Sequence, residues 1–181
     1  FISSLINLQL KYALDTNVSS ELMQSKSRLT ALSLLNKFIL KNHEVTPEIC
    51  MKEYIDYLIH MLIKQHQNGN GLDKEMFNVH SDTAIETEKA IPLGLLINEI
   101  LLFTLSNEFY DKERGIQISI SNSGVSGKFK FELLNLHQPN GWYETFKGTL
   151  SEKIITRLTQ QLQSEMNFDY DDHIRFSFTF N

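Results

Sequence analysis

An amide and a carboxylate stand side by side within residues 92–109, the most apolar stretch of this sequence. Their neighbours are Leu96, Ile97, Ile100 and Leu101. Because a buried amide or carboxylate is costly unless it has a partner, Asn98 and Glu99 need a reason to be there. We interpret the pair in one of two ways. Either it lines a site for a polar ligand, or it is structural, with the amide capping a strand end and the carboxylate facing solvent.

The first part of the chain must position this stretch, and its apolar residues recur at helical spacing. The spacing predicts a first helix that ends near Asp15, a turn at 15–20 with N-cap residues, and a long second helix. The expected buried faces are Ile2, Leu5, Ile6 and Gln9 on the first helix and Leu22, Leu29, Leu32, Leu35 and Ile39 on the second. Two such helices form an antiparallel hairpin. Since one hairpin leaves an apolar seam, we expect two copies to pair as a four-helix bundle.

A third helix is predicted from about Met51 to Gln65, after a break at residues 46–48. Its expected buried side is Tyr54, Ile55, Leu58, Leu62 and Ile63. Residues 68–71, Asn-Gly-Asn-Gly, then form a turn.

Beyond this turn the apolar period changes to two, which is typical of half-buried strands. Alternation predicts strands at residues 76–81, 116–121, 129–133 and 174–180. Two helices separate them, one over 92–109 and one from Thr149 to about Gln163 striped by leucines and isoleucine. The fold class is therefore α+β. We expect a helical domain over residues 1–67 and an α/β sandwich with a mixed sheet over residues 68–181.

Composition excludes several classes of protein. The chain has 181 residues, 41% of them hydrophobic, a net charge of −5 and no basic stripe, so we expect no nucleic-acid partner. Cys50 stands alone, which fits a reducing cytosol, and we expect it to be a small buried residue. We expect no membrane span, no direct membrane contact and a cytoplasmic location. Because the sequence begins with Phe1, we expect a piece of a longer protein, such as the cytosolic part of a membrane-anchored sensor.

Three segments carry a family resemblance. Residues 92–99, Pro-Leu-Gly-Leu-Leu-Ile-Asn-Glu, resemble the N box that lines the ATP pocket of bacterial sensor histidine kinases. Residues 2–9 and 27–32 are similar to the second type of histidine-kinase dimerisation and phosphoacceptor domain. Tyr54 to Leu58 resembles a Tyr-Leu segment of the same family. The resemblance implies a second domain of the GHKL or Bergerat type, also called HATPase-like, and a phosphoacceptor His upstream of Phe1.

The resemblance fails at the groups that bind nucleotide in that family. Phe103 stands where the family has the Asn that holds magnesium. The adenine-reading Asp and the glycines of the next box are replaced in Leu133 to Pro139, and we expect Leu133 and His137 to block the base pocket. In the last box, Glu152 at a helix start would repel a phosphate.

These departures indicate a kinase fold that has lost its ATP chemistry. We expect no catalytic residue within the chain, no metal site and no cofactor, with Asn98 and Glu99 as remnants of the ATP- and magnesium-binding site. The hypothesis is a dimeric, ATP-binding-defective two-component core, a pseudokinase that serves as phosphotransfer or scaffold partner for a response-regulator receiver domain. The alternatives are an active histidine kinase with a divergent ATP site and an interaction module without phosphoryl chemistry.

Overall fold

The computed structural model describes most of the chain, namely residues 16–41, 48–66, 72–81, 83–123, 128–136, 142–164, 166–170 and 174–180. The helices are α2 (Thr16–Lys41), α3 (Met51–His66), α4 (Thr87–Ser106), α5 (Trp142–Phe146) and α6 (Leu150–Gln161). The strands are β1 (Glu48–Cys50), β2 (Phe77–Ser81), β3 (Ala84–Glu86), β4 (Ile116–Asn122), β5 (Phe129–Leu136), β6 (Met166–Tyr170) and β7 (Ile174–Phe180). A 3-10 turn at Lys74–Met76 precedes β2. The first predicted helix lies outside the described residues.

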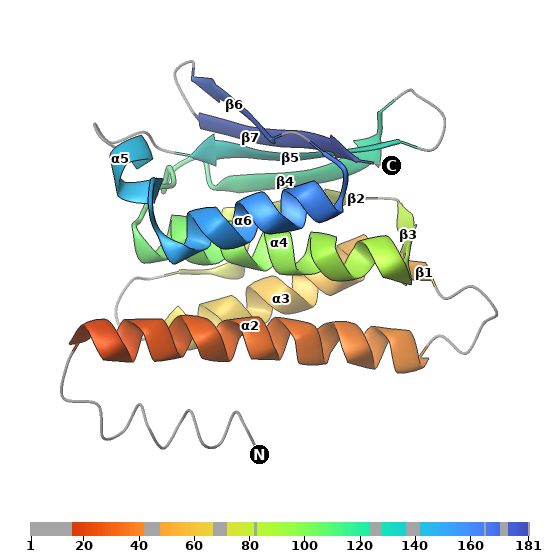
Figure 1. Ribbon diagram of the computed structural model, residues 1–181, viewed down its shortest axis with the longest axis horizontal. Helices are drawn as coiled ribbons and strands as arrows, with labels where there is room; N and C mark the ends of the chain where they lie inside the picture. Colours follow the sequence, from red (N-terminus) through yellow and green to blue (C-terminus); the bar gives the residue numbers. More distant parts are fainter. Residues whose placement is uncertain are drawn as a thin grey trace.

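The elements form three layers (Figure 1). A five-stranded sheet in the order β2-β4-β5-β7-β6 lies on one side, with α3, α4 and α6 below it and α2 beneath them. Strands β2 and β4 are parallel and the other neighbours are antiparallel, so the sheet is mixed. The α+β prediction is confirmed.

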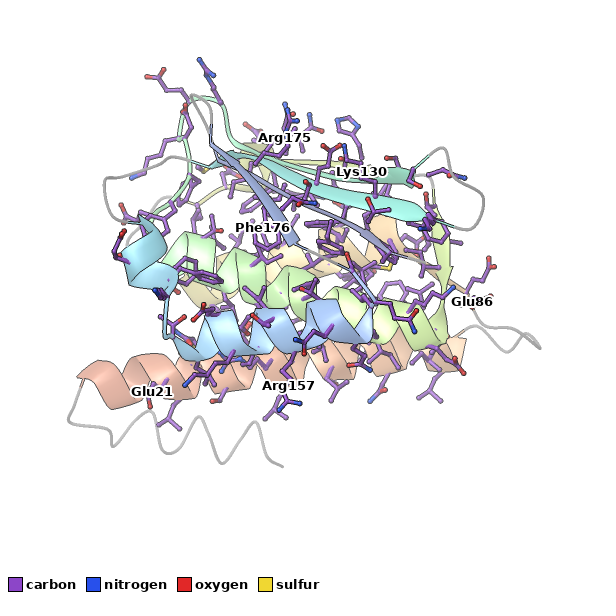
Figure 2. The ribbon with its side chains drawn as sticks, turned by 45° about the horizontal axis from the view of Figure 1, so that its top comes forward. Glu21, Glu86, Lys130, Arg157, Arg175 and Phe176 are labelled. Atoms are coloured by element: carbon purple, nitrogen blue, oxygen red, sulfur yellow. The ribbon has the colours of Figure 1, made fainter. Side chains whose placement is uncertain are left out.

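The sheet buries mainly the face that the helices cover. Phe131 of β5 stacks on Phe178 of β7 with ring centroids 4.9 Å apart, and both rings are buried. Figure 2 shows Phe176 on the helix side of β7, whereas Lys130 and Arg175 lie on the outer side. The alternation expected for β4, β5 and β7 is therefore confirmed, because strand side chains point to opposite faces in turn.

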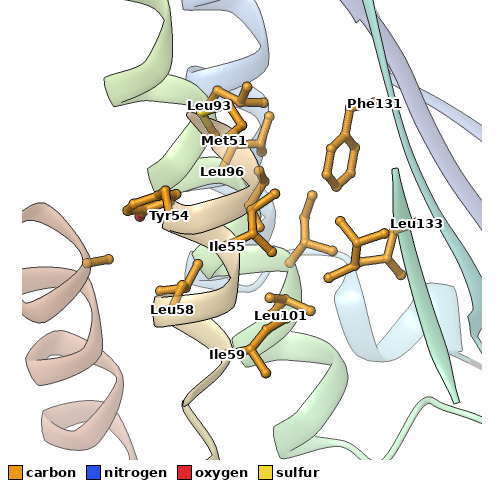
Figure 3. Packing of buried hydrophobic residues seen from close by; sticks show 14 of the residues in the cluster. Met51, Tyr54, Ile55, Leu58, Ile59, Leu93, Leu96, Leu101, Phe131 and Leu133 are labelled. Atoms are coloured by element: carbon orange, nitrogen blue, oxygen red, sulfur yellow. The ribbon is translucent and has the colours of Figure 1, made fainter. Parts of the chain in front are cut away.

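Helix α3 is buried on two sides. Tyr54 points toward α2, while Ile55 points toward Leu133 of the sheet (Figure 3). All five residues predicted for its buried side are buried, which confirms that face. Although α3 falls within the predicted helical domain, it contacts β2 and α4 as well as α2. The boundary between residues 67 and 68 stays a prediction.

Helix α4 begins five residues earlier than predicted, at Thr87, and includes Pro92. By length and composition it is apolar enough to cross a membrane, contrary to our expectation that no stretch is. Inside the fold, however, 72% of its most apolar window is buried, as in the core helix of a soluble domain. It ends at Ser106, and the next residue, Asn107, caps it, because its amide and side chain both donate to the Phe103 carbonyl, at 3.3 and 2.8 Å.

The buried faces of α2 and α6 differ from the predicted stripes. On α2 the buried residues are Ser27, Ala31, Leu34, Leu35 and Phe38, so only Leu35 of the expected five is fully buried. On α6 the buried residues are Ser151, Ile155 and Thr159, and of the predicted stripe Leu150, Ile154, Leu158 and Leu162 only Leu162, at the C-cap, is fully buried. Ser27 of α2 and Ser151 of α6 face α4 because each hydrogen-bonds to a polar side chain of that helix. A prediction based on the spacing of apolar residues does not detect such a face.

Three short strands were missed. Strands β1 and β3 pair antiparallel as a separate ribbon, with Ile49 opposite Ile85, and three residues are too few to show a period. Cys50 is the last residue of β1 and is exposed, so the prediction that it is buried is wrong. The third missed strand, β6, pairs antiparallel with β7 and ends at Tyr170.

Candidate functional site

Asn98 and Glu99 of α4 are buried and face α2 and α6. Glu99 is 1% exposed and Asn98 is fully buried. The Arg28 guanidinium of α2 donates twice to the Glu99 carboxylate, from Nε to Oε2 at 2.8 Å and from Nη2 to Oε1 at 2.7 Å. The Ser151 hydroxyl of α6 donates to Oε1 at 2.6 Å. The carboxylate that needed a partner is thus satisfied from two helices, in the strong bidentate geometry.

Asn98 is only partly satisfied. The Ser27 hydroxyl donates to its Oδ1 at 3.2 Å. Its Nδ2 is buried and has no hydrogen-bond partner within the described part of the chain. Neither Asn98 nor Glu99 faces solvent, and the side-chain oxygens of both accept hydrogen bonds from residues of α2. We call Ser27, Arg28, Asn98, Glu99 and Ser151 the polar corner.

One helical turn beyond Glu99, the face of α4 becomes aromatic. The Phe103 ring packs edge-on against Phe146 of α5, with centroids 5.0 Å apart, and lies 5.5 Å from Phe109. Phe109 and Phe146 are buried, and Phe103 is half-buried against the core. We call these three residues the aromatic corner. At Phe103 there is therefore packed hydrocarbon rather than an oxygen ligand.

The start of α6 is closed by its own residues. The Thr149 hydroxyl accepts a hydrogen bond from the Glu152 amide at 3.1 Å, and the Glu152 carboxylate accepts from the Gly148 amide at 2.5 Å. This reciprocal arrangement is close to a capping box. The anion that the helix N-terminus favours is thus supplied by Glu152 itself.

A cleft of about 410 Å³ opens where these parts meet. Its polar lining includes Glu21, Gln24 and Arg28 of α2 and Thr149 and Ser151 at the start of α6, and Phe103 forms part of its apolar wall. Helix α2 therefore runs along one wall of the cleft.

The structure brings together only some of the predicted site residues. Asn98, Glu99 and Phe103 lie on successive turns of α4, and Leu133 is buried on β5. His137 lies outside the described residues. Sequence reasoning missed Arg28 and Ser151 as partners of Glu99, from which they lie 71 and 52 residues away. The one available signal was the need of a buried carboxylate for a cation.

Comparisons with known proteins agree on one family. A family model described as histidine kinase, of the HisKA_2 type, matches residues 1–66. The histidine kinase domain from the Erythrobacter litoralis EL346 blue-light activated histidine kinase is 21% identical, with a TM-score of 0.66 over 98% of this chain and 84% of that one. The longer structure of that kinase is 20% identical, with a TM-score of 0.67 over 98% of this chain. No curated protein matches.

This chain spans 58% of the longer Erythrobacter structure. At these identities the likeness shows the fold, which is that of a sensor histidine kinase core with an HATPase-like domain.

The residues on α4 do not fit the ATP and magnesium that the family uses. Phe103 offers no ligand atom, and Glu99 is already paired with Arg28. Magnesium prefers oxygen ligands in octahedral geometry. Among the described residues, no three His, Cys, Asp or Glu side chains gather where they could hold a metal ion.

Proposed function

We propose that this histidine-kinase-like core is a pseudokinase that does not use ATP and that works as a dimeric phosphotransfer or scaffold partner for a response-regulator receiver domain. One observation carries the proposal. The Phe103 ring, packed between Phe109 and Phe146, stands at the position where the family's magnesium ligand belongs. Phosphoryl transfer depends on positioning and on a metal that neutralises charge, and a phenyl ring supplies neither.

Two further features support the loss of nucleotide binding. The Glu99 carboxylate is used by Arg28 and Ser151. The start of α6 is capped by Glu152, so a phosphate there would meet a carboxylate. Each feature removes a different part of a nucleotide site, and they lie around one cleft.

The remaining parts of the proposal rest on the family match over residues 1–66. We propose that the chain pairs with a second copy through this region, that it acts in the cytoplasm, and that a phosphoacceptor His precedes Phe1 in the whole protein. Residues 1–67 and 68–181 are proposed as its helical and sandwich domains.

The test is a calorimetric titration of the chain with magnesium-ATP, together with an autophosphorylation assay of the whole protein with γ-labelled ATP. We expect no saturable heat and no label on protein. An active sensor kinase of known affinity is the positive control. A dissociation constant in the range of about 1–100 μM, which corresponds to about −8 to −5.5 kcal/mol, would overturn the proposal.

A second measurement tests the partner role. The whole protein is incubated with a receiver domain that has been phosphorylated by a separate kinase, and transfer of label to the protein is followed. Transfer supports phosphotransfer. Binding without transfer supports a scaffold, and the absence of both supports the interaction module without phosphoryl chemistry.

A further inference from the structure

Helix α5 is too short to be stable by itself. It has five residues, Trp142–Phe146, whereas an isolated helix of fewer than about 12 residues is marginal in water. Of the side chains described in α5, Glu144 and Thr145 are exposed and Phe146 is buried. The contacts of Phe146 therefore hold this end of α5 in place.

The Phe146 ring is seated on the end of α4. It meets the Phe103 ring edge-on at 5.0 Å, and Phe103 in turn lies 5.5 Å from Phe109. Edge-to-face ring pairs stabilise a structure beyond the apolar area that they bury. Because all three rings belong to the chain itself, this anchor needs no bound molecule.

The turn from α5 to α6 is closed by hydrogen bonds of its own. The Phe146 carbonyl accepts one bond from the Thr149 amide at 3.2 Å and another from the Thr149 hydroxyl at 2.6 Å. Gly148 has a φ of +81°, in the region that favours glycine, and its amide donates to the Glu152 carboxylate. The position of Phe146 is thereby tied to the start of α6.

The same segment forms part of the wall of the cleft described above. Thr145, Thr149 and Leu150 line the cleft, and so does Phe103. The ring that anchors α5 and the residues that α5 carries into the wall are thus neighbours. The place where α5 is held decides the shape of the cleft on this side.

We propose that residues 142–149 are an aromatic strap, held by Phe146 in a socket of Phe103 and Phe109, which fixes this wall of the cleft without a bound ligand. Phe103 then does more than leave out a metal ligand, because its ring is the seat of the strap. The strap rests on the proposed function only in what it expects of magnesium-ATP.

Hydrogen exchange of the whole chain, followed by mass spectrometry, tests the strap. Phe103→Ala and Phe146→Ala are each expected to raise the exchange rate over residues 142–149 at least about tenfold relative to residues 92–101 of α4. The reference to α4 separates local release from a general loss of stability. The double variant is expected to show no further rise, since both changes remove one contact.

The fluorescence anisotropy of Trp142 gives a second measurement. Trp142 is the only tryptophan of the chain and the first residue of α5, so its signal reports on the strap alone. The anisotropy is expected to fall in Phe103→Ala and in Phe146→Ala. Where Phe146→Ala fails to fold, Phe146→Leu keeps apolar volume but loses the edge-on ring contact, and a smaller change is expected in both measurements.

Phe129→Ala is the matched control. Phe129 is another partly buried ring, and it lies 5.5 Å from the ring of Phe180. It begins β5 and pairs with Phe180, the last residue of β7, at the end of the sheet where the C-terminus lies, whereas α5 lies at the other end (Figure 1). We expect its truncation to leave the relative exchange over residues 142–149 unchanged.

Unchanged exchange over residues 142–149 in both single variants would overturn the strap, as would a rise equal to that in Phe129→Ala. Magnesium-ATP is expected to leave the exchange of the wild type unchanged. If it slowed exchange there while Phe103→Ala still raised exchange without nucleotide, the strap would be supported and the proposed function would fail.

Discussion

The polar corner and the aromatic corner lie one turn apart on α4, and they differ in two ways from the ligand site that the family resemblance implies for this helix. In the polar corner the residue types Asn98 and Glu99 are those of the N box, but their acceptor oxygens are occupied by α2 and α6. In the aromatic corner the residue type itself has changed, and Phe103 joins a cluster of rings. A residue that matches a family motif can therefore serve a different partner, and only its contacts reveal this.

The largest expected effect comes from breaking the polar corner on one side only. Arg28→Leu leaves the Glu99 carboxylate buried without a cation and is expected to lower the free energy of unfolding by about 3 kcal/mol. The double variant Arg28→Leu, Glu99→Leu is expected to lie within about 1 kcal/mol of the wild type, because both charges are gone. Urea unfolding of the wild type and of these two variants measures the difference.

The exposed Lys52–Asp56 pair calibrates this result, since exposed pairs contribute little. Lys52→Leu is expected to change the free energy of unfolding by less than about 0.5 kcal/mol. Equal losses for Arg28→Leu and for the double variant would contradict the view that the buried charge sets the cost.

Truncation of Phe103 in the aromatic corner is expected to cost less than the one-sided break. Phe103→Ala removes a half-buried ring that touches Phe146 and Phe109, and the expected loss is about 2 kcal/mol, below the range for fully buried Phe. Phe146→Ala removes a ring with 3% exposure and is expected to cost about 3 kcal/mol. A loss for Phe103→Ala above that for Phe146→Ala would show that Phe103 is more central to the cluster than its exposure indicates.

Phe103→Asn introduces the residue type that the family resemblance implies at this position, and it tests ATP chemistry separately from stability. We expect no ATP hydrolysis and no autophosphorylation, because Leu133 is buried at the sheet and Arg28 still holds Glu99. Loss of ring packing is expected to lower stability by about 2 kcal/mol. Release of phosphate by this single variant, measured with labelled ATP, would show that the later nucleotide box has been misaligned.

The sequence predicted the parts of the fold that depend on local periodicity. The buried face of α3 and the inward residues of β5 and β7 follow from spacings of 3.6 and 2. The buried face of α2 was not predictable in this way, because apolar residues such as Leu22, Leu29 and Leu40 lie on its other side and Leu40 is 70% exposed. The spacing of apolar residues alone does not show which of two apolar faces of a helix is buried.

The candidate site was predictable only in part for a related reason. Asn98 and Glu99 stood out because polar residues in an apolar helix need partners, but the identity of the partners depends on which helices the fold brings together. Arg28 lies 71 residues away, among other polar residues of α2, and nothing in its spacing marks it.

The smallest expected effect on stability is at the hydroxyl of Tyr54, which lacks the hydrogen-bond partners that the side chains of the polar corner have. The Tyr54 hydroxyl is buried, and none of the described residues accepts or donates a hydrogen bond there. Tyr54→Phe is expected to leave the free energy of unfolding unchanged or to raise it by up to about 1 kcal/mol, because an unsatisfied hydroxyl costs desolvation without return. By contrast Ser151→Ala, which removes a donor to Glu99, is expected to lower it by about 1–2 kcal/mol.

The two variants also differ in alkaline solution. Burial raises the pKa of Tyr54 above its ordinary value of 10.0, so the folded protein keeps the phenol proton that the unfolded chain releases. Stability contributed by this group is therefore present below pH 10 and falls as the pH rises above it, by up to about 1.4 kcal/mol per pH unit. Burial and the nearby Glu108 carboxylate also raise the pKa of Tyr110, which adds to the slope. Tyr54→Phe is expected to reduce the fall in the free energy of unfolding with rising pH, whereas Ser151→Ala should leave that fall unchanged. Urea unfolding between pH 9 and 11 measures the slope of this free energy against pH for both variants. Equal slopes would show that Tyr54 is accessible to water.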